Sequence, residues 1–278
     1  MKLAFSTLGC PTWELPEIIQ AAKRLGYQAV ELRAVGGSLD LLGRTEFQQS
    51  QLAVTSRWFA EEGIEICCVD TSCTFHSPEK SDRLAQVELA IKHAELAAHL
   101  GVPLIRVFPD KVQQGSTWTE TRDNISWCLH EVAKRVPAGV QVCLETHGDF
   151  ARGELTAETV KLADHPNVSI IWDIANSMAA GDSIGEAALA VRPYLAHVHL
   201  RDAKPVENSE HWLPVLAGRG MVHFPKALKA LVDLNYGGYV SFEWEKYWHP
   251  EIEEPEVAFA DFISAIKESS RTSQAMVT

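Results

Sequence analysis

Short apolar segments alternate with longer amphipathic segments along the whole chain. The short segments are rich in Val and Ile and nearly continuous in apolar character, as expected for parallel strands covered on both faces. They predict eight strands, at residues 2–6, 28–33, 64–70, 103–108, 140–145, 168–173, 195–200 and 239–244. The longer segments carry apolar residues at helical spacing and predict eight helices, at residues 16–25, 45–62, 79–100, 119–135, 157–164, 183–191, 224–234 and 253–269.

Eight consecutive strand–helix repeats favour an α/β fold with a single closed (β/α)8 TIM barrel over an open doubly wound sheet, which usually has fewer strands. Gly26, Gly63 and Gly101 follow the first three helices and are expected to end them. No linker rich in Pro, Gly or Ser divides the chain, so we expect a catalytic barrel domain at 1–270 and a polar tail at 271–278. The longest irregular segment, 201–223, follows the seventh strand, on the side where barrels build active sites.

Composition and charge limit the cellular compartments and the classes of partner that we expect for this chain. The N-terminus reaches Cys10 and Pro11 after few apolar residues, so we expect neither a signal peptide nor a membrane span. The six cysteines lack paired C-x-x-C spacing and are expected to be small buried side chains in a reducing compartment, which favours the cytoplasm. The formal charge of -12, without a Lys/Arg cluster, argues against nucleic acid and anionic membranes as partners.

Four strands in the second half of the chain end in residues that commonly bind metals. Glu145, Asp173, His199 and Glu243 each interrupt or end an apolar strand, whereas His197 is expected to point outward toward a helix. In a barrel these strand ends are neighbours around one half of the rim, so the four side chains should converge. Two carboxylates about 4 Å apart repel by roughly 4 kcal/mol at an effective dielectric near 20, so three carboxylates need neutralisation.

Raised pKa values, nearby Lys or Arg side chains, or a divalent cation could supply that neutralisation. Only the cation uses the three carboxylates and the imidazole together. Such a ligand set suits Mn²⁺ or Mg²⁺ best and leaves Co²⁺ and Zn²⁺ open, with too few soft ligands for a closed structural zinc site. We therefore predict one metal ion with open coordination positions. Each carboxylate alone could instead be a helix N-cap, a surface charge or part of an ion pair.

At these motifs the sequence resembles the xylose isomerase-like TIM-barrel superfamily. The resemblance is to its sugar phosphate isomerase/epimerase family, related to endonuclease IV, inosose dehydratase and ketose 3-epimerases. It spans nearly the whole chain and is carried by FSTLGCPTWELPE, GYQAVELR, LETHGDF, IIWDIANS, HVHLRD, GRGMVHFP and GGYVSFEWEKYWHPEIEEPE. These motifs are more specific for the superfamily than for the reaction.

The resemblance implies the same four metal ligands: Glu145 of LETHG, Asp173 of WDIAN, His199 of HVHLRD and Glu243 of FEWE. In isomerases and epimerases of the group the first and last Glu also act as the acid/base pair, which implies catalytic roles for Glu145 and Glu243. The implied activity is that of a metal-dependent isomerase or epimerase of a small sugar, sugar phosphate or polyol-derived ketone. Proton transfer would pass through a metal-stabilised enediolate.

Two other functions stay open at this stage. A metal-dependent dehydratase of the inosose- or dehydroshikimate-dehydratase type would use the same ligands and expel a hydroxyl group. A non-catalytic sugar-binding protein on a barrel scaffold is the alternative outside enzymes. Endonuclease IV activity is disfavoured, because the fourth strand ends in RVFPDK without a His and Asn176 stands where many relatives carry one. A small sugar-like partner is expected, and a homo-oligomer is left open.

Further residues are candidates for contact with the substrate. His147 follows Glu145 by two residues and would share its orientation if the strand continued. Arg106, if it faces the barrel interior, could bind a carboxylate or phosphate or could form a structural ion pair. Asn176 retains a hydrogen-bond donor. The candidates on loops are Asp202, Arg219, His76 and Trp13.

Overall fold

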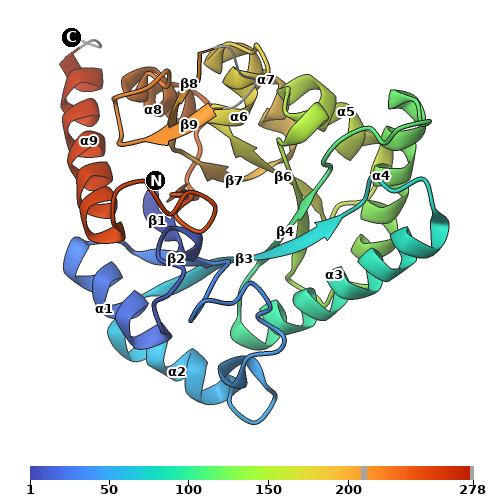
Figure 1. The fold of residues 1–278 in the computed structure, drawn as a ribbon, viewed down its shortest axis with the longest axis horizontal. Helices are drawn as coiled ribbons and strands as arrows, with labels where there is room; N and C mark the ends of the chain where they lie inside the picture. The colour runs from blue at the N-terminus through green and yellow to red at the C-terminus, as the bar shows by residue number, and fades with distance from the viewer. Residues whose placement is uncertain (208–211, 276–278) are drawn as a thin grey trace.

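Eight parallel strands form a closed barrel at the centre of the molecule. The computed structural model describes residues 1–207 and 212–275, and the strands close in the order β1-β10-β7-β6-β5-β4-β3-β2 (Figure 1). The predicted (β/α)8 barrel is therefore confirmed. Its strands are β1 (Lys2–Ser6), β2 (Ala29–Leu32), β3 (Glu65–Thr74), β4 (Leu104–Phe108), β5 (Gln141–Glu145), β6 (Val168–Asp173), β7 (Leu195–His199) and β10 (Tyr239–Phe242).

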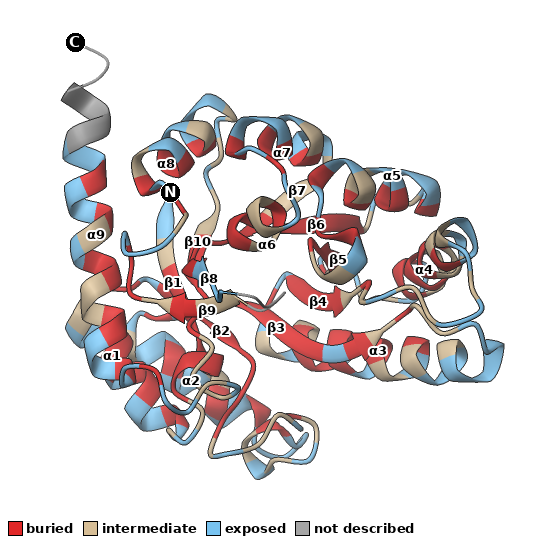
Figure 2. Ribbon diagram, turned by 45° about the horizontal axis from the view of Figure 1, so that its top comes forward, coloured by how far each residue is buried: buried red, intermediate tan, exposed pale blue. Residues whose placement is uncertain are grey.

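Helices surround the barrel and connect its strands (Figure 1). Their apolar faces are buried toward the strands and their polar faces are exposed, as the buried and exposed stripes in Figure 2 show. This arrangement follows from the helical spacing of apolar residues in the sequence. The helices are α1 (Leu15–Leu25), α2 (Leu52–Glu62), α3 (Lys80–Leu100), α4 (Trp118–Ala133), α5 (Gly153–Ala163), α6 (Ile174–Ala179), α7 (Ile184–Val191), α8 (Phe224–Asp233) and α9 (Pro255–Ala275).

Local signals fix where several helices begin and end. The first three helices end at Gly26, Gly63 and Gly101, which adopt positive φ angles of 83°, 67° and 73°, as predicted. A capping box starts α4, where the Thr117 side chain accepts from the backbone of Glu120 and the Glu120 side chain accepts in return. These caps satisfy backbone groups that the helix itself leaves unpaired.

The structure differs from the sequence prediction in several places. The segment predicted as one helix at 45–62 contains a 3₁₀ turn, η2 (Thr45–Phe47), and then α2, because the backbone is extended at Gln48. The segment predicted as irregular at 201–223 contains an antiparallel hairpin of β8 (Asp202–Pro205) and β9 (Trp212–Val215). The short helix α6 follows β6 directly and was not predicted.

Helix α9 continues to Ala275, into the segment expected to form a polar tail. The domain boundary at 270 therefore stays a prediction. Among the described residues, none of the helices has both the length and the apolar character needed to cross a membrane. All six cysteines are free and buried, as the sequence predicts.

Candidate metal centre

The four predicted ligand residues converge at the C-terminal ends of their strands. Glu145, Asp173 and His199 are the last residues of β5, β6 and β7, and Glu243 directly follows β10. All four side chains are buried, and one ligand atom of each lies within 4.8 Å of the others. The sheet register pairs Asp173 with His199, so adjacent strands bring both residues to one level of the barrel. The geometry is that of a candidate metal centre.

The imidazole of His199 is oriented by a residue that the sequence analysis missed. Its Nε2 lies 3.0 Å from Oε1 of Glu31 on β2. Its Nδ1 lies 3.4 Å from Oε2 of Glu243 and 4.0 Å from Oε1 of Glu145, and has no hydrogen-bond partner among the described residues. Donation from Nε2 to Glu31 would leave the Nδ1 lone pair facing the carboxylates, an arrangement typical of a histidine that ligates a metal.

Two buried arginines also contact the carboxylates. Nη1 of Arg106 donates to Oε2 of Glu145 at 2.7 Å and lies 3.6 Å from Oε1 of Glu243. Arg106 thus faces the barrel interior and forms the structural ion pair that the sequence left open. Nε of Arg201 donates to Oδ2 of Asp173 at 3.0 Å. Arg201 was not predicted as a site residue, although it follows His199 by two residues, which on an extended chain gives it the same orientation.

Asp173 combines two of the roles considered from the sequence. Its Oδ1 accepts from the backbone N–H of Asn176 at 2.8 Å and caps the N-terminus of α6, while its side chain also belongs to the candidate metal centre. The amide of Asn176 lies between two members of the site. Its Oδ1 accepts from Arg201 at 2.8 Å, and its Nδ2 donates to Oε1 of Glu145 at 3.4 Å.

The electrostatic environment acts in opposite directions on the two glutamates. Burial by itself would raise the pKa of Glu243, but His199, Arg106 and Arg201 outweigh it and lower that pKa to about 2. Burial raises the pKa of Glu145, and Glu243 adds to the rise although Arg106 opposes it. Burial would lower the pKa of His199, but Glu31 and Glu243 hold it well above its usual range. The carboxylates therefore favour a cation at the position that Nδ1 faces.

The charges of the buried groups fit a divalent ion. The buried carboxylates around the centre are Glu31, Asp70, Glu145, Asp173 and Glu243, and the buried guanidinium groups are Arg33, Arg106 and Arg201. Carboxyl groups therefore outnumber guanidinium groups among these buried side chains, as expected where a cation binds. Three carboxylates and one imidazole are hard and borderline ligands, as Mn²⁺, Mg²⁺, Co²⁺ and Zn²⁺ require. Both the orphaned Nδ1 and the donor set therefore fit the predicted metal.

A cavity of about 320 Å³ opens above the centre. Glu145 and Glu243 line it, together with the predicted contact residues Arg106, His147 and Asn176. Asp173 and His199 are fully buried and are not among its lining residues. Two aromatic side chains that the sequence analysis did not single out, Phe108 and Trp248, also line the cavity. The cavity therefore exposes only the two glutamates of the quartet.

The structure does not bring the four loop candidates to this cavity. The Asp202 carboxylate is buried and accepts from the backbone N–H groups of Ala203, Gly220 and Val222 at 2.8–3.0 Å, so it holds its loop together. Arg219 is exposed and lies 3.6 Å from Asp261 on α9. The others are His76, which lies 3.8 Å from Asp110, and Trp13, which packs edge-on against Phe259.

The expectation that His197 points outward is wrong. Residues two apart on a strand face the same side, so His197 points into the barrel like His199. Its Nε2 lies 2.6 Å from Oε2 of Glu31, which thus contacts both histidines. Glu31 could have been found in the sequence, because it is an acidic residue inside the apolar strand segment QAVELR.

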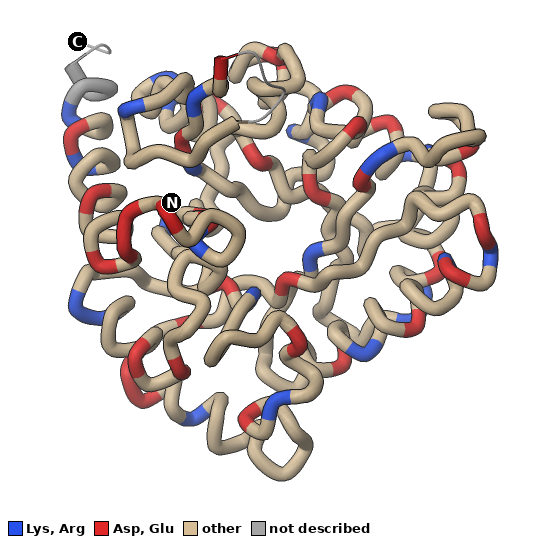
Figure 3. Tube along the Cα trace, viewed as in Figure 1, with Lys and Arg blue, Asp and Glu red and all other residues tan. Residues whose placement is uncertain are grey.

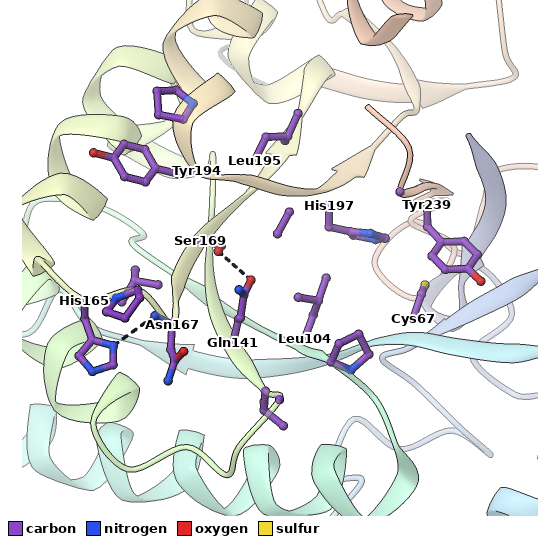
Figure 4. Close-up of a pocket in the computed structure, with 18 residues that line it drawn as sticks. Cys67, Leu104, Gln141, His165, Asn167, Ser169, Tyr194, Leu195, His197 and Tyr239 are labelled. Atoms are coloured by element: carbon purple, nitrogen blue, oxygen red, sulfur yellow. Dashed lines mark hydrogen bonds between the residues drawn. The ribbon is translucent and has the colours of Figure 1, made fainter. Parts of the chain in front are cut away.

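A larger cavity of about 830 Å³ lies at the opposite end of the barrel. Its lining includes Leu104, Gln141 and Leu195, the first residues of β4, β5 and β7. Ser169 donates to Gln141 there at 2.8 Å, and His197 also reaches this cavity (Figure 4). Active sites of TIM barrels lie at the C-terminal ends of the strands, so the smaller cavity is the candidate active site.

Acidic and basic residues are interspersed along the outer helices in the view of Figure 3. This distribution agrees with the absence of a Lys/Arg cluster in the sequence. The expectation that the chain binds no nucleic acid stays a prediction.

Two curated proteins are similar to parts of the chain. A D-psicose 3-epimerase of Ruminiclostridium cellulolyticum is 31% identical over 121 residues, which cover 41% of this chain and 38% of that protein. A probable endonuclease 4 of Campylobacter concisus is 30% identical over 146 residues, which cover 46% of this chain and 50% of that protein. The matches therefore span half or less of the length of these relatives.

Solved structures resemble the fold over its full length. The structure of the IOLI protein with a binding zinc atom superposes with a TM-score of 0.78 at 20% identity and covers 98% of both chains. The family described as xylose isomerase-like TIM barrel matches residues 19–268. With the closed barrel and with most of its length matched, the chain belongs to the xylose isomerase-like TIM barrel family.

Proposed function

We propose that the chain is a divalent-metal-dependent isomerase or epimerase of a small sugar, sugar phosphate or polyol-derived ketone. The observation that carries the proposal is that Glu145 and Glu243, and not Asp173 or His199, line the cavity above the four-residue centre. Two carboxylates facing one cavity can remove a proton from a carbon atom and return it, which is the chemistry that isomerisation and epimerisation share. The D-psicose 3-epimerase similarity supports this reaction class.

Glu145, Asp173, Glu243 and Nδ1 of His199 would hold the metal. When bound, a divalent metal supplies a Lewis acid that polarises a carbonyl oxygen and stabilises negative charge that develops on it. Glu31 would keep the His199 ring in place through Nε2. Arg201 and the backbone of Asn176 would orient the two oxygens of Asp173.

The two glutamates would divide the proton transfer between them. Arg106 contacts both, at 2.7 Å from Oε2 of Glu145 and 3.6 Å from Oε1 of Glu243, so it orients both carboxylates toward one substrate. Oε1 of Glu145 and Oε2 of Glu243 lie 4.0 Å and 3.4 Å from Nδ1 of His199, so these two oxygens would face the metal or a substrate proton. Trp248, which lines the cavity, would pack against the apolar face of a polyol.

The test of the proposed reaction is proton NMR in deuterated water with Mg²⁺ as the added metal. Incubation with candidate ketoses should introduce deuterium at the carbon next to the carbonyl while the sugar keeps its molecular formula. The same samples are then analysed by mass spectrometry. Loss of one water molecule from the substrate would assign the chain to the dehydratases instead, and binding without exchange would favour a sugar-binding protein.

Metal uptake is expected to require His199. We expect the full chain to bind one equivalent of Mn²⁺ and to gain roughly 2.7 kcal/mol of unfolding free energy at a free metal concentration of 100 times Kd. His199→Ala should weaken binding by more than ~100-fold, because even loss of a group that only orients a ligand costs about 10–100-fold. Calorimetry and elemental analysis measure both.

His99→Ala, which removes an exposed histidine on α3, is the matched control and should bind metal like the unaltered chain. Equal affinity of His199→Ala and His99→Ala would contradict the assigned metal centre.

A further inference from the structure

Arg33 is a buried arginine whose guanidinium group lacks an ion-pair partner. It directly follows β2, and only 4% of its surface is exposed. Nη2 donates to Oγ of Ser72 at 2.9 Å. Nη1 is buried and has no hydrogen-bond partner in the part of the chain that the structure describes. One nitrogen of this guanidinium group is therefore an unsatisfied hydrogen-bond donor.

The other two buried arginines of the site differ from Arg33 in this respect. Arg106 contacts Glu145 at 2.7 Å, and Arg201 contacts Asp173 at 3.0 Å. Among residues 1–207 and 212–275, no carboxylate lies within 4.0 Å of the Arg33 guanidinium. Burial, reinforced by the charge of Arg106, lowers the pKa of Arg33 to about 10, so the group still carries its charge near pH 7. A buried charge without a partner destabilises a fold, which makes a role in binding an anion a physical reason to retain it.

Arg33 lines the same cavity as Glu145 and Glu243. Ser72, which accepts from Arg33, and Thr74 also line the cavity. Arg106 cannot take its place, because its guanidinium stacks 3.9 Å above the ring of Phe108 and is engaged by Glu145. The lining of the cavity thus includes Glu145 and Glu243 together with a guanidinium group that lacks an ion-pair partner.

We infer that the substrate is an acid, whose carboxylate or phosphate group binds Nη1 of Arg33 while its hydroxyl-bearing carbons reach Glu145 and Glu243. Both groups offer oxygens that accept charge-assisted hydrogen bonds from a guanidinium group. This inference rests on the proposed function in one respect, because that function places the substrate in this cavity. It adds that the substrate carries a negative charge, which the four-residue centre alone does not imply.

The test compares acidic probes with their neutral counterparts. D-gluconate is paired with D-glucitol for the carboxylate, and D-fructose 6-phosphate with D-fructose for the phosphate. Calorimetric titration of the full chain, with and without Mn²⁺, should show one acid binding about 30-fold or more tighter than its counterpart, since a buried charge pair typically contributes at this level. The acid that binds more tightly than its neutral counterpart shows whether the negative charge comes from a carboxylate or from a phosphate. Equal affinity within both pairs would overturn the inference.

Variants then assign the preference to Arg33. Arg33→Met keeps the length of the apolar stem and should abolish the preference for the acid, while Arg135→Met, which removes an exposed arginine, should leave it unchanged. Arg33→Lys keeps the positive charge but loses the planar pair of guanidinium N–H donors, so the preference for the acid should fall several-fold. This variant tests the assignment even if Arg33→Met does not fold. Preference retained in folded Arg33→Met, or undiminished in Arg33→Lys, would contradict the assignment.

Protein stability provides a second readout that a structural arginine would not produce. Because Arg33 is unpaired in the free protein, Arg33→Met should not lower the midpoint of thermal unfolding without ligand, and only the unaltered chain should gain stability from the acid. A lowered midpoint with no change in acid binding would make Arg33 structural. Acid binding lost in Arg33→Met without any isotope exchange in the unaltered chain would refute the proposed reaction and leave the anion site intact.

Discussion

Glu243→Gln should lower kcat for the confirmed substrate by about 10²–10⁴-fold, the range that a general acid or base contributes. Gln has nearly the same shape as Glu but cannot take up a proton at pH 7. Glu145→Gln should lower kcat in the same range. The rates are measured under saturating Mn²⁺, with the bound metal quantified, because each change also removes a charged ligand atom. A fall in kcat at full metal occupancy then reports the proton transfer.

The matched control is Glu88→Gln, which removes an exposed carboxylate on α3 that pairs with Arg135. It should keep kcat within about twofold, since surface ion pairs have small effects. If Glu243→Gln and Glu145→Gln both turned over the substrate as fast as Glu88→Gln, neither residue could be the acid or base. The site would then serve to bind and orient the ligand only.

Arg106→Met should destabilise the metal-free protein by about 3–5 kcal/mol, the usual result of removing one partner from a buried ion pair. Arg106 lies 2.7 Å from Glu145, 3.6 Å from Glu243 and 3.8 Å from Asp70, so its loss leaves three buried carboxylates without this countercharge. Added Mn²⁺ should recover part of the loss, because a cation at the centre neutralises two of the same carboxylates. Urea unfolding with EDTA and with Mn²⁺ measures both quantities.

Arg135→Met, at the surface, is the control for this experiment and should change the unfolding free energy by less than about 1 kcal/mol. The decisive quantity is the stabilisation by Mn²⁺, which should be larger in Arg106→Met than in the unaltered chain. Equal stabilisation by Mn²⁺ in both proteins would show that Arg106 and the metal do not act on the same charges.

The strands and the site quartet could be predicted because both depend on local pattern. Apolar segments such as VSIIWD specify a strand buried on both faces, and β6 forms at Val168–Asp173 as predicted. Glu145, Asp173, His199 and Glu243 were recognisable because each polar residue stands at the end of such a segment. Once eight strands are assigned to a barrel, topology alone requires their C-terminal ends to meet at one rim.

Which charged residue pairs with which member of the quartet could not be predicted from the sequence. Arg106 was a candidate whose orientation the sequence left open. Arg201 was not predicted, although its neighbour Asp202 was. Glu31 lies on β2, far from His199 in the sequence. Strand pattern indicates which side of the sheet a residue faces, but not which opposite charge it meets across the barrel. That choice depends on the stagger between strands and on the reach of long side chains.

The positions of the loop side chains could not be predicted from the sequence either. Trp13 and Arg219 lie on loops that follow the C-terminal ends of barrel strands. Even so, Trp13 packs against Phe259 and Arg219 lies beside Asp261. Loops follow no fixed period, so a pattern cannot decide which of their side chains turn inward. Trp248, from the loop after β10, lines the cavity instead.

By itself, the sequence determined the barrel, the positions of its strands and the four residues at the strand ends, because period and polarity are local properties. Only the tertiary structure decided which groups neutralise them. It pairs Arg106 with Glu145 and Arg201 with Asp173, and it leaves Arg33 buried in the cavity without a carboxylate partner. The reason is physical: the energy of a buried charge depends on distances of a few ångströms to groups from other strands, and only the closed barrel sets those distances.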